Sequence, residues 1–190
     1  MYHGYLFDLD GTLVESALDF EKIRNELNIK PNEDIIHHVN ALPEELRKAK
    51  EQRLQEIEIE AAEKAKYFPG VPELLREIKN SKVPIGILTR NCRAVLDVTI
   101  QRLGIEVDLA YCREDAPPKP DPTGALHFLA KYKLEASKTL FVGDYKFDVE
   151  CGQRAGMKTA VFLQGNSSSS SWGADFSFLH YHELRRHLAF

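Results

Sequence analysis

Three short apolar runs, each ending in a polar residue, restrict the fold of this chain more than any other feature of its sequence. Near-continuous apolar stretches of this length are typical of parallel strands that are buried on both faces of a sheet. Helical patterns lie between the runs, so strands and helices are expected to alternate. This alternation predicts an α/β fold built on a doubly wound parallel sheet. The three runs cover residues 5–8, 83–89 and 139–144.

Weaker patterns extend this prediction to the rest of the chain. Further strands are expected at 108–112 and 158–163, and helices at 71–80, 92–103, 122–132 and 149–155. In the tail, residues 174–179 predict a short edge strand and residues 181–188 a closing helix. The serine-rich segment 165–173 is low in complexity and predicts a mobile loop without an assigned function.

Residues 15–68 break the alternation, because they are helical in pattern and highly charged. We expect an inserted helical subdomain here, with residues 1–14 and 69–190 forming the core domain. A first helix is expected at 18–29, a second capped by Asn32, and a long third one opened by Pro43. An apolar stripe is expected on the third helix at Leu46, Leu54, Ile57, Ala61 and Ala65.

The inserted helices have two possible roles. They could form a solvated hairpin that only covers the core, or a lid over the ligand crevice. The lid is favoured, because the insertion leaves the chain just after Asp10 and returns beside the same sheet edge. In doubly wound sheets that edge, at the carboxyl ends of the strands, is where ligands bind.

Charge and cysteine content exclude several classes of protein. The 190 residues carry a formal net charge of −4 without a basic block, which argues against a nucleic-acid partner. The three cysteines are widely spaced, which indicates reduced thiols and no zinc site. No apolar run approaches the ~18 residues of a membrane span, so a cytoplasmic protein without a membrane partner is expected. The oligomeric state stays open.

Asp8 and Asp10 stand two residues apart where the first apolar run ends, and Gly11 follows them. Because side chains two residues apart in a strand point to the same face, the two carboxylates are expected to lie close together and to repel each other. Such a pair needs a counterion, a shared proton or two different roles. The alternative is a strand that simply runs into an Asp-Gly turn, which would be the commoner explanation of this short motif alone.

Three more motifs follow in order, and together they decide between these alternatives. Thr89 ends the second apolar run, Lys119 lies in a proline-rich loop, and Gly143-Asp144 is followed by Asp148. With this set of four motifs, residues 4–163 resemble the haloacid dehalogenase (HAD) superfamily, in its branch of phosphatases with a helical cap inserted after the first motif. The resemblance implies a Rossmann-like core with a small inserted cap.

The carboxylates suit the hydrolysis of a phosphate ester. Asp8, Asp144 and Asp148 offer the hard oxygen donors that Mg²⁺ prefers, and the resemblance adds the backbone carbonyl of Asp10 as a metal ligand. Asp8 is expected to attack phosphorus and form an aspartyl-phosphate. Asp10 is expected to protonate the leaving oxygen and later deprotonate water. The substrate is expected to be a small-molecule phosphate ester.

Thr89 is expected to bind a phosphate oxygen through its hydroxyl, and Lys119 is expected to bind another through the charge of its ammonium. Gly11, Arg90 and Asn91 are further candidates for the phosphate-binding side. Each position also has a purely structural explanation: a strand threonine, a solvated lysine, an arginine in an exposed ion pair, or a helix cap at Asn91. Asp144 and Asp148 could likewise be a helix cap and a surface acid. Jointly these explanations are improbable.

A few neighbouring residues are weaker candidates. Arg113, His37 and His38 could contact the substrate, although ion pairing and solvation are the commoner fates of such side chains. Asp121 precedes a proline at a helix start, which favours helix capping over catalysis.

Among HAD proteins, the carboxylate at Asp10 favours phosphatases, since the resemblance implies that dehalogenases and phosphonatases lack it. The leading hypothesis is a Mg²⁺-dependent phosphatase similar to phosphoglycolate phosphatases. A phosphomutase of the β-phosphoglucomutase type is the alternative, but the short insertion favours entry of water. A non-catalytic binding protein is a third hypothesis. Such a protein would be expected to have lost the nucleophile or a metal ligand, whereas all four motifs are intact here.

Overall fold

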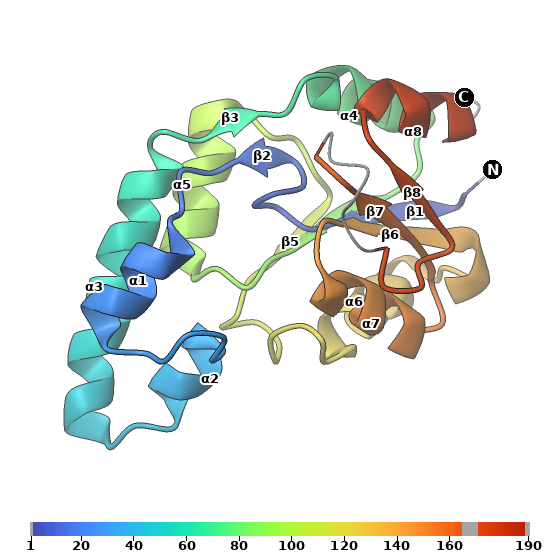
Figure 1. Ribbon diagram of the computed structural model, residues 1–190. Helices are drawn as coiled ribbons and strands as arrows, with labels where there is room; N and C mark the ends of the chain where they lie inside the picture. Colours follow the sequence, from blue (N-terminus) through green and yellow to red (C-terminus); the bar gives the residue numbers. More distant parts are fainter. Residues whose placement is uncertain (1, 165–170, 189–190) are drawn as a thin grey trace.

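A computed structural model describes residues 2–164 and 171–188 of the chain (Figure 1). Six strands form one sheet in the order β5-β4-β1-β6-β7-β8, and every neighbouring pair is parallel. The α/β fold with a doubly wound parallel sheet is therefore confirmed. The strands are β1 (Gly4–Phe7), β4 (Ile85–Leu88), β5 (Leu109–Tyr111), β6 (Thr139–Gly143), β7 (Lys158–Phe162) and β8 (Phe176–Phe178).

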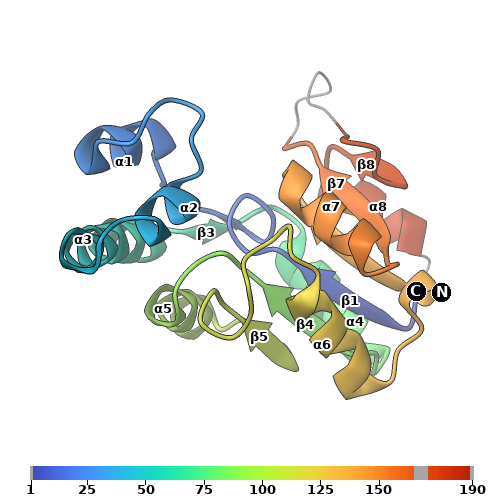
Figure 2. The ribbon, with the colours of Figure 1, turned by 90° about the horizontal axis from the view of Figure 1, so that it is seen from below.

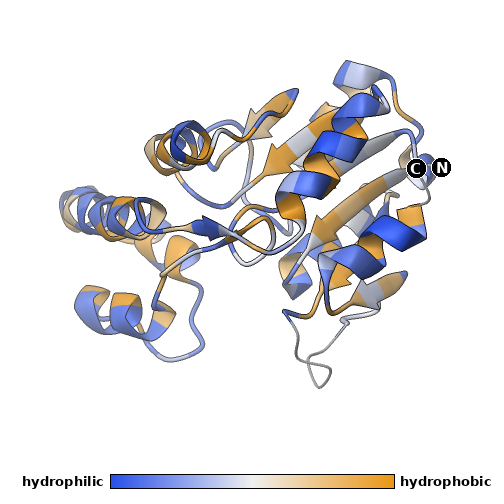
Figure 3. Ribbon diagram, turned by 90° about the horizontal axis from the view of Figure 1, so that it is seen from above, coloured by the Kyte–Doolittle hydropathy of each residue, from blue (hydrophilic) through white to orange (hydrophobic). Residues whose placement is uncertain are grey.

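Helices cover both faces of the sheet, as the alternating side chains of β1 require. Tyr5 and Phe7 point into one core, which receives apolar residues from helices α4, α5 and α8. Leu6 points into the opposite core, against helices α6 and α7. Figure 3 shows hydrophobic residues along the strands and hydrophilic residues on outward helix surfaces. These helices are α4 (Val71–Asn80), α5 (Arg93–Leu103), α6 (Thr123–Tyr132), α7 (Lys146–Arg154) and α8 (Tyr181–Leu188), and a short 3-10 helix, Ala136–Lys138, precedes β6.

The chain leaves and re-enters this core through a two-stranded antiparallel ribbon, β2 (Val14–Glu15) and β3 (Lys66–Tyr67). Between these strands lie helices α1 (Phe20–Leu27), α2 (Ile35–Asn40) and α3 (Glu44–Ala62). Figures 1 and 2 show the three helices together at one side of the sheet, away from the chain termini. They enclose a small apolar cluster of their own, which includes Ile23, Leu27, Val39 and Leu54.

Two expectations for these inserted helices are wrong. Helix α2 is capped by Asp34, whose carboxylate accepts the N–H of His37 at 2.9 Å, whereas Asn32 has a left-handed φ of 67° two residues earlier. Asp34 is the cap because its backbone is extended and its carboxylate can accept an N–H of the first helical turn. The apolar stripe is shorter than expected, because Leu46 is 57% exposed and Ala65 lies beyond the end of α3, packed in the core of the sheet.

Several boundaries of the core helices also differ from expectation. Helix α7 begins at Lys146 rather than at residue 149, and α5 begins at Arg93 with Cys92, not Asn91, as its cap residue. All three cysteines are free and buried. None of the helices in the described ranges is long and apolar enough to cross a membrane. Most of the serine-rich segment expected to be a mobile loop, residues 165–170, lies outside the described residues.

Candidate active site

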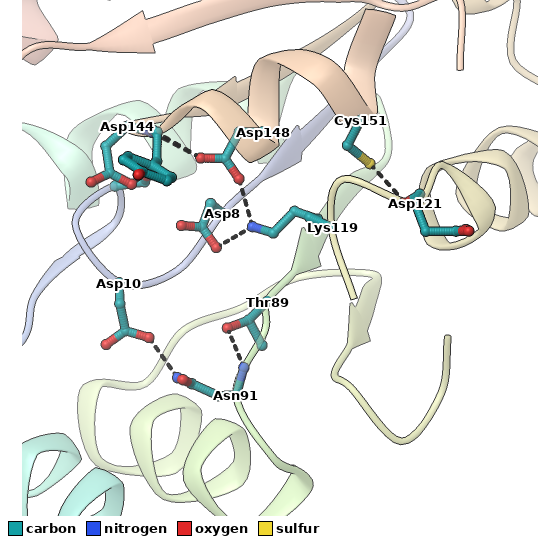
Figure 4. Close-up of polar contacts among 11 residues, drawn as sticks. Asp8, Asp10, Thr89, Asn91, Lys119, Asp121, Asp144, Asp148 and Cys151 are labelled. Atoms are coloured by element: carbon teal, nitrogen blue, oxygen red, sulfur yellow. Dashed lines mark hydrogen bonds and ion pairs between the residues drawn. The ribbon is translucent and has the colours of Figure 1, made fainter. Parts of the chain in front are cut away.

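The carboxyl ends of three central strands bring the candidate residues together at one sheet edge. Asp8 follows β1, Thr89 follows β4 and Asp144 follows β6, and these strands are neighbours in the sheet. Lys119 reaches the same place from the loop before α6, and Asp148 from the first turn of α7 (Figure 4). The structure therefore gathers in one place five residues from four separate stretches of the sequence, since only Asp144 and Asp148 are near each other in the chain.

Lys119 lies between two carboxylates at the centre of the site. Its Nζ is 2.5 Å from Asp8 Oδ1 and 2.7 Å from Asp148 Oδ1, and its side chain is only 2% exposed. Burial alone would lower the pKa of Lys119, but the two carboxylates raise it above the ordinary lysine value, so the ammonium stays charged. Lys119 is thus a buried structural counterion rather than a solvated loop lysine.

The site still holds more negative charge than Lys119 can neutralise. Carboxylate oxygens of Asp8, Asp144 and Asp148 all lie within 4.8 Å of one another. Burial first, and then the neighbouring carboxylate of Asp148, raise the pKa of Asp144 to about 7. Burial also raises the pKa of Asp8 well above its ordinary value, although Lys119 opposes the shift. Three hard oxygen donors with one ammonium between them fit a divalent cation such as Mg²⁺.

Two glycines, Gly11 and Gly143, allow the backbone to lie very close to the carboxylates of Asp144 and Asp148. Gly11 has a φ of +78°, and a Cβ added there would lie 2.3 Å from an oxygen of Asp144. A Cβ at Gly143 would lie 2.2 Å from the side chain of Asp148. No other residue could occupy these positions without displacing a carboxylate. Gly11 therefore has a clear packing role.

Asp148 explains how the site is tied to helix α7. One of its oxygens accepts the N–H groups of Asp144 and Tyr145, at 3.2 and 3.0 Å, while the other faces Lys119. Asp148 is thus a helix cap and a buried member of the acidic cluster at the same time. The hydroxyl of Thr12, in the loop after β1, donates to Asp144 Oδ1 at 3.3 Å.

Asp10 lies beside the cluster and is held by the loop after β4. The side-chain Nδ2 of Asn91 donates to Asp10 Oδ2 at 2.5 Å, and the Oγ1 of Thr89 accepts the N–H of Asn91 at 3.1 Å. Burial raises the pKa of Asp10, and hydrogen bonds from Asn91 and Ser16 partly oppose this shift. The side chain of Asn91 therefore binds Asp10 and does not cap helix α5. The pattern of residues around Asn91 carried no signal for this contact.

The two arginines near the site meet the inserted helices. Arg90 donates to both oxygens of Asp34 at 2.8 and 2.6 Å, and its guanidinium lies 4.6 Å from the centre of the Phe147 ring. Arg113 binds both oxygens of Glu58 on α3, at 3.1 and 3.2 Å. The pair of Arg113 and Glu58 is buried, not exposed as expected. Sequence reasoning missed both acidic partners, Asp34 and Glu58.

The remaining candidates lie away from the acidic cluster. His37 is exposed, and His38 pairs with Glu33 at 2.9 Å; neither lines the cavity described below. Asp121 accepts the N–H of Thr123, the first residue of α6, at 2.9 Å, but it stands one residue before the cap position, which is Pro122 and not Asp121 as expected.

A cavity of about 550 Å³ opens between the acidic cluster and the inserted helices. Asp8, Asp10 and Thr89 line its core side, and residues of α1, α2 and α3 line the opposite side. The two arginine contacts bridge the same two sides. A ligand bound at the acidic cluster would therefore also touch the insertion.

The sequence profile of haloacid dehalogenase-like hydrolases matches residues 5–162, which include this whole constellation. The chain belongs to this family. A haloacid dehalogenase-like hydrolase domain-containing protein of Arabidopsis thaliana is 31% identical over 83% of this chain and 69% of its own length. A phosphoglycolate phosphatase of Aquifex aeolicus is 29% identical over 90% of each chain.

Solved structures agree with the family fold. A hydrolase from Pseudomonas syringae superposes with a TM-score of 0.81 over 98% of this chain and 97% of its own, at 18% identity. This likeness concerns the fold of the hydrolase family, which the motif order had predicted.

Proposed function

We propose that this hydrolase is a Mg²⁺-dependent phosphatase that cleaves a small phosphorylated metabolite by way of an aspartyl-phosphate. The observation that carries the proposal is Asp8, which lines the cavity, is paired with the buried Lys119, and belongs to the three-carboxylate cluster. The Aquifex aeolicus relative, named a phosphoglycolate phosphatase, supports the reaction class. We further propose that the protein works in the cytoplasm.

In this proposal the buried charges prepare the attack on phosphorus. Asp8, Asp144, Asp148 and the backbone carbonyl of Asp10 would hold Mg²⁺, which when bound offsets the charge of the phosphate and of the nucleophile. Lys119 keeps the Asp8 carboxylate oriented and adds positive charge beside the phosphoryl oxygens. The hydroxyl of Thr89 is buried at the cavity wall and would donate to another phosphoryl oxygen.

Asp10 would carry the protons of both half-reactions. As Asp8 bonds to phosphorus and the ester P–O bond breaks, the carboxyl of Asp10 gives its proton to the leaving alkoxide. In the second step Asp10 takes a proton from the water that attacks the aspartyl-phosphate, which releases inorganic phosphate and restores Asp8. The hydrogen bond from Asn91 keeps Asp10 at the cavity wall for both steps.

The test is phosphate release from a panel of sugar phosphates, nucleotides and small phosphorylated acids in the presence of Mg²⁺. We expect Asp8→Asn to lower kcat by a factor of at least ~10³, since the nucleophile is lost. Asp121→Asn is the matched control, because Asp121 only accepts the N–H of Thr123 at the start of α6 and an asparagine oxygen can accept the same hydrogen bond.

Two outcomes would contradict the proposal: no release from any ester, or full activity of Asp8→Asn. Product analysis with a hexose phosphate separates a phosphatase from a phosphomutase, because only the mutase conserves organic phosphate.

A further inference from the structure

Two side chains from the end of the chain reach the candidate active site, although the family profile does not cover them. The profile matches residues 5–162, and Gln164 and Tyr181 lie beyond that range. Gln164 stands two residues after the end of β7, and Tyr181 is the first residue of α8, at the C-terminal end of the chain (Figure 1). Both side chains bind the turn at Gly11 and Thr12, which comes just after Asp10.

Tyr181 holds this turn from inside the core. Its hydroxyl donates to the backbone carbonyl of Thr12 at 2.6 Å, and both residues are buried. The ring of Tyr181 packs against the rings of Phe162 and Phe178, with centroids 4.9 and 5.3 Å away. The packing of the core therefore directs the hydroxyl at the turn.

Gln164 holds the same turn from the side of the cavity, which it lines. Its amide nitrogen donates to the backbone carbonyl of Gly11 and to Oδ2 of Asp144, both at 3.0 Å. Both partners are acceptors, so only the NH₂ end of the amide can satisfy them. Gln164 therefore links the turn after Asp10 to the loop after β6.

Asp144 is held at both of its oxygens as a result. Its Oδ1 accepts the hydroxyl of Thr12 at 3.3 Å, and its Oδ2 accepts the amide of Gln164. Each carboxylate oxygen has two lone pairs, so Asp144 can still bind a cation. Groups that donate to a metal ligand in this way fix its orientation and raise its affinity for the metal.

We infer that Gln164 and Tyr181 are positioning residues of the candidate magnesium site. Gln164 binds the ligand Asp144 directly, whereas Tyr181 holds Thr12 where its hydroxyl meets Asp144. The inference rests on the proposed Mg²⁺-dependent function and adds the end of the chain to it. A residue that only stabilised the fold would leave the affinity for Mg²⁺ unchanged.

The first experiment measures the dissociation constant of Mg²⁺ by isothermal titration calorimetry, without substrate, for the full chain and two variants. Gln164→Met keeps the length of the side chain but removes its donor, and we expect the dissociation constant to rise about tenfold. Tyr181→Phe keeps the packed ring and removes only the hydroxyl. We expect a smaller rise of about threefold, because Tyr181 acts through Thr12.

Two control variants lose the same groups elsewhere in the structure. In Gln153→Met the lost amide donates to the carbonyl of Gly173 at 2.9 Å, and in Tyr132→Phe the lost hydroxyl donates to the carbonyl of Asp108 at 2.8 Å. Neither Gln153 nor Tyr132 lines the cavity, so both variants should bind Mg²⁺ as the wild type does.

The outcomes separate the inference from the proposed function. An unchanged dissociation constant in Gln164→Met or in Tyr181→Phe would overturn the role of that residue. Gln164 is exposed, so its variant tests the inference even where Tyr181→Phe is less stable. No binding of Mg²⁺ by the wild type would instead defeat the metal dependence of the proposed function.

The second experiment tests whether Tyr181 acts through Thr12. Thr12→Val removes the hydroxyl that binds Asp144 and keeps a side chain of similar shape. In that background Tyr181→Phe should change the dissociation constant of Mg²⁺ by less than about twofold, because the contact that it supports is already lost. The same factor with and without Thr12→Val would overturn this path.

Discussion

Asp10 is held by hydrogen bonds from the side chains of Asn91 and Ser16. Asn91 Nδ2 is 2.5 Å from Asp10 Oδ2, and the backbone N–H of Asn91 is in turn fixed by Thr89. Asn91 touches the proposed proton carrier, so we regard it as a positioning residue. Its removal should affect the step in which Asp10 donates a proton more than the binding of substrate.

We therefore predict that Asn91→Ala lowers kcat for a sugar phosphate by about 10²-fold, with a smaller change in KM. With p-nitrophenyl phosphate, whose leaving group needs no proton, the loss should be much smaller. Steady-state kinetics with both esters measure this difference. Asn80→Ala, at the exposed end of α4, serves as the control. Equal losses on both esters would mean that Asn91 acts on the site in general and not on Asp10.

At the scale of the element, the inserted helices are attached to the core in two different ways. Helix α3 packs on α5 and is bound by the buried pair of Glu58 and Arg113, and Arg102 donates to the carbonyls of Ala62 and Ala65. Within the described residues, the hydrogen bonds that join α2 and its cap to the core are those from Arg90 to Asp34. Each attachment includes a carboxylate paired with an arginine, Glu58 with Arg113 and Asp34 with Arg90, so protonation can weaken both.

The pKa of Asp34 is lowered in the folded chain: burial raises it, but the N–H of His37 and the charge of Arg90 outweigh burial. A lowered pKa means that the carboxylate stabilises the fold fully above its unfolded value of 3.8 and that this stability is lost as pH falls through the lower folded value. We expect Asp34→Asn to reduce the free energy of unfolding by about 1 kcal/mol at neutral pH.

The difference between wild type and Asp34→Asn should shrink as the pH falls below 3.8, which urea unfolding at a series of pH values measures. Asp19→Asn is the control, because Asp19 caps α1 in the same way and no arginine binds it. A difference that stays constant with pH would show that Arg90 contributes nothing through the charge of Asp34.

These elements also show how far the sequence leads. The ends of β1, β4 and β6 could be predicted because each rests on a local apolar run that stops at Asp8, Thr89 or Asp144. The contact of Arg90 with Asp34 spans 56 positions, and that of Asn91 with Asp10 spans 81. Local periodicity carries no information on such pairs, because they depend on how distant segments of the chain pack together. The misplaced cap of α2 is a local error, since both Asn and Asp are favoured cap residues and Asp34 stands two positions after Asn32.

At the scale of the whole molecule, the parallel sheet concentrates charge at one edge. The carboxylates of Asp8, Asp144 and Asp148 come from two segments of the chain, and Lys119 comes from a third. Folding therefore buries several like charges with a single ammonium, and the stability of the entire domain depends on their compensation.

We predict that Lys119→Met lowers the free energy of unfolding by about 3 kcal/mol in metal-free buffer, since two buried carboxylates lose their counterion. Added Mg²⁺ should restore part of this loss, because a cation bound to the folded chain stabilises it. Urea unfolding with and without Mg²⁺ gives both values. Lys64→Met, at an exposed position, is the control. Unchanged stability of Lys119→Met would exclude a structural role for the ammonium.

The ribbon of β2 and β3 joins the inserted helices to the core through only two residue pairs, Val14 with Tyr67 and Glu15 with Lys66. Because the two crossing points are adjacent, the length of chain between them changes the closure entropy only slowly and leaves the sheet untouched. The inserted helices, which we propose to contact the substrate, can therefore be lengthened, shortened or exchanged by recombination while the acidic cluster is inherited unchanged. Such an arrangement lets new substrate preferences evolve on an old reaction.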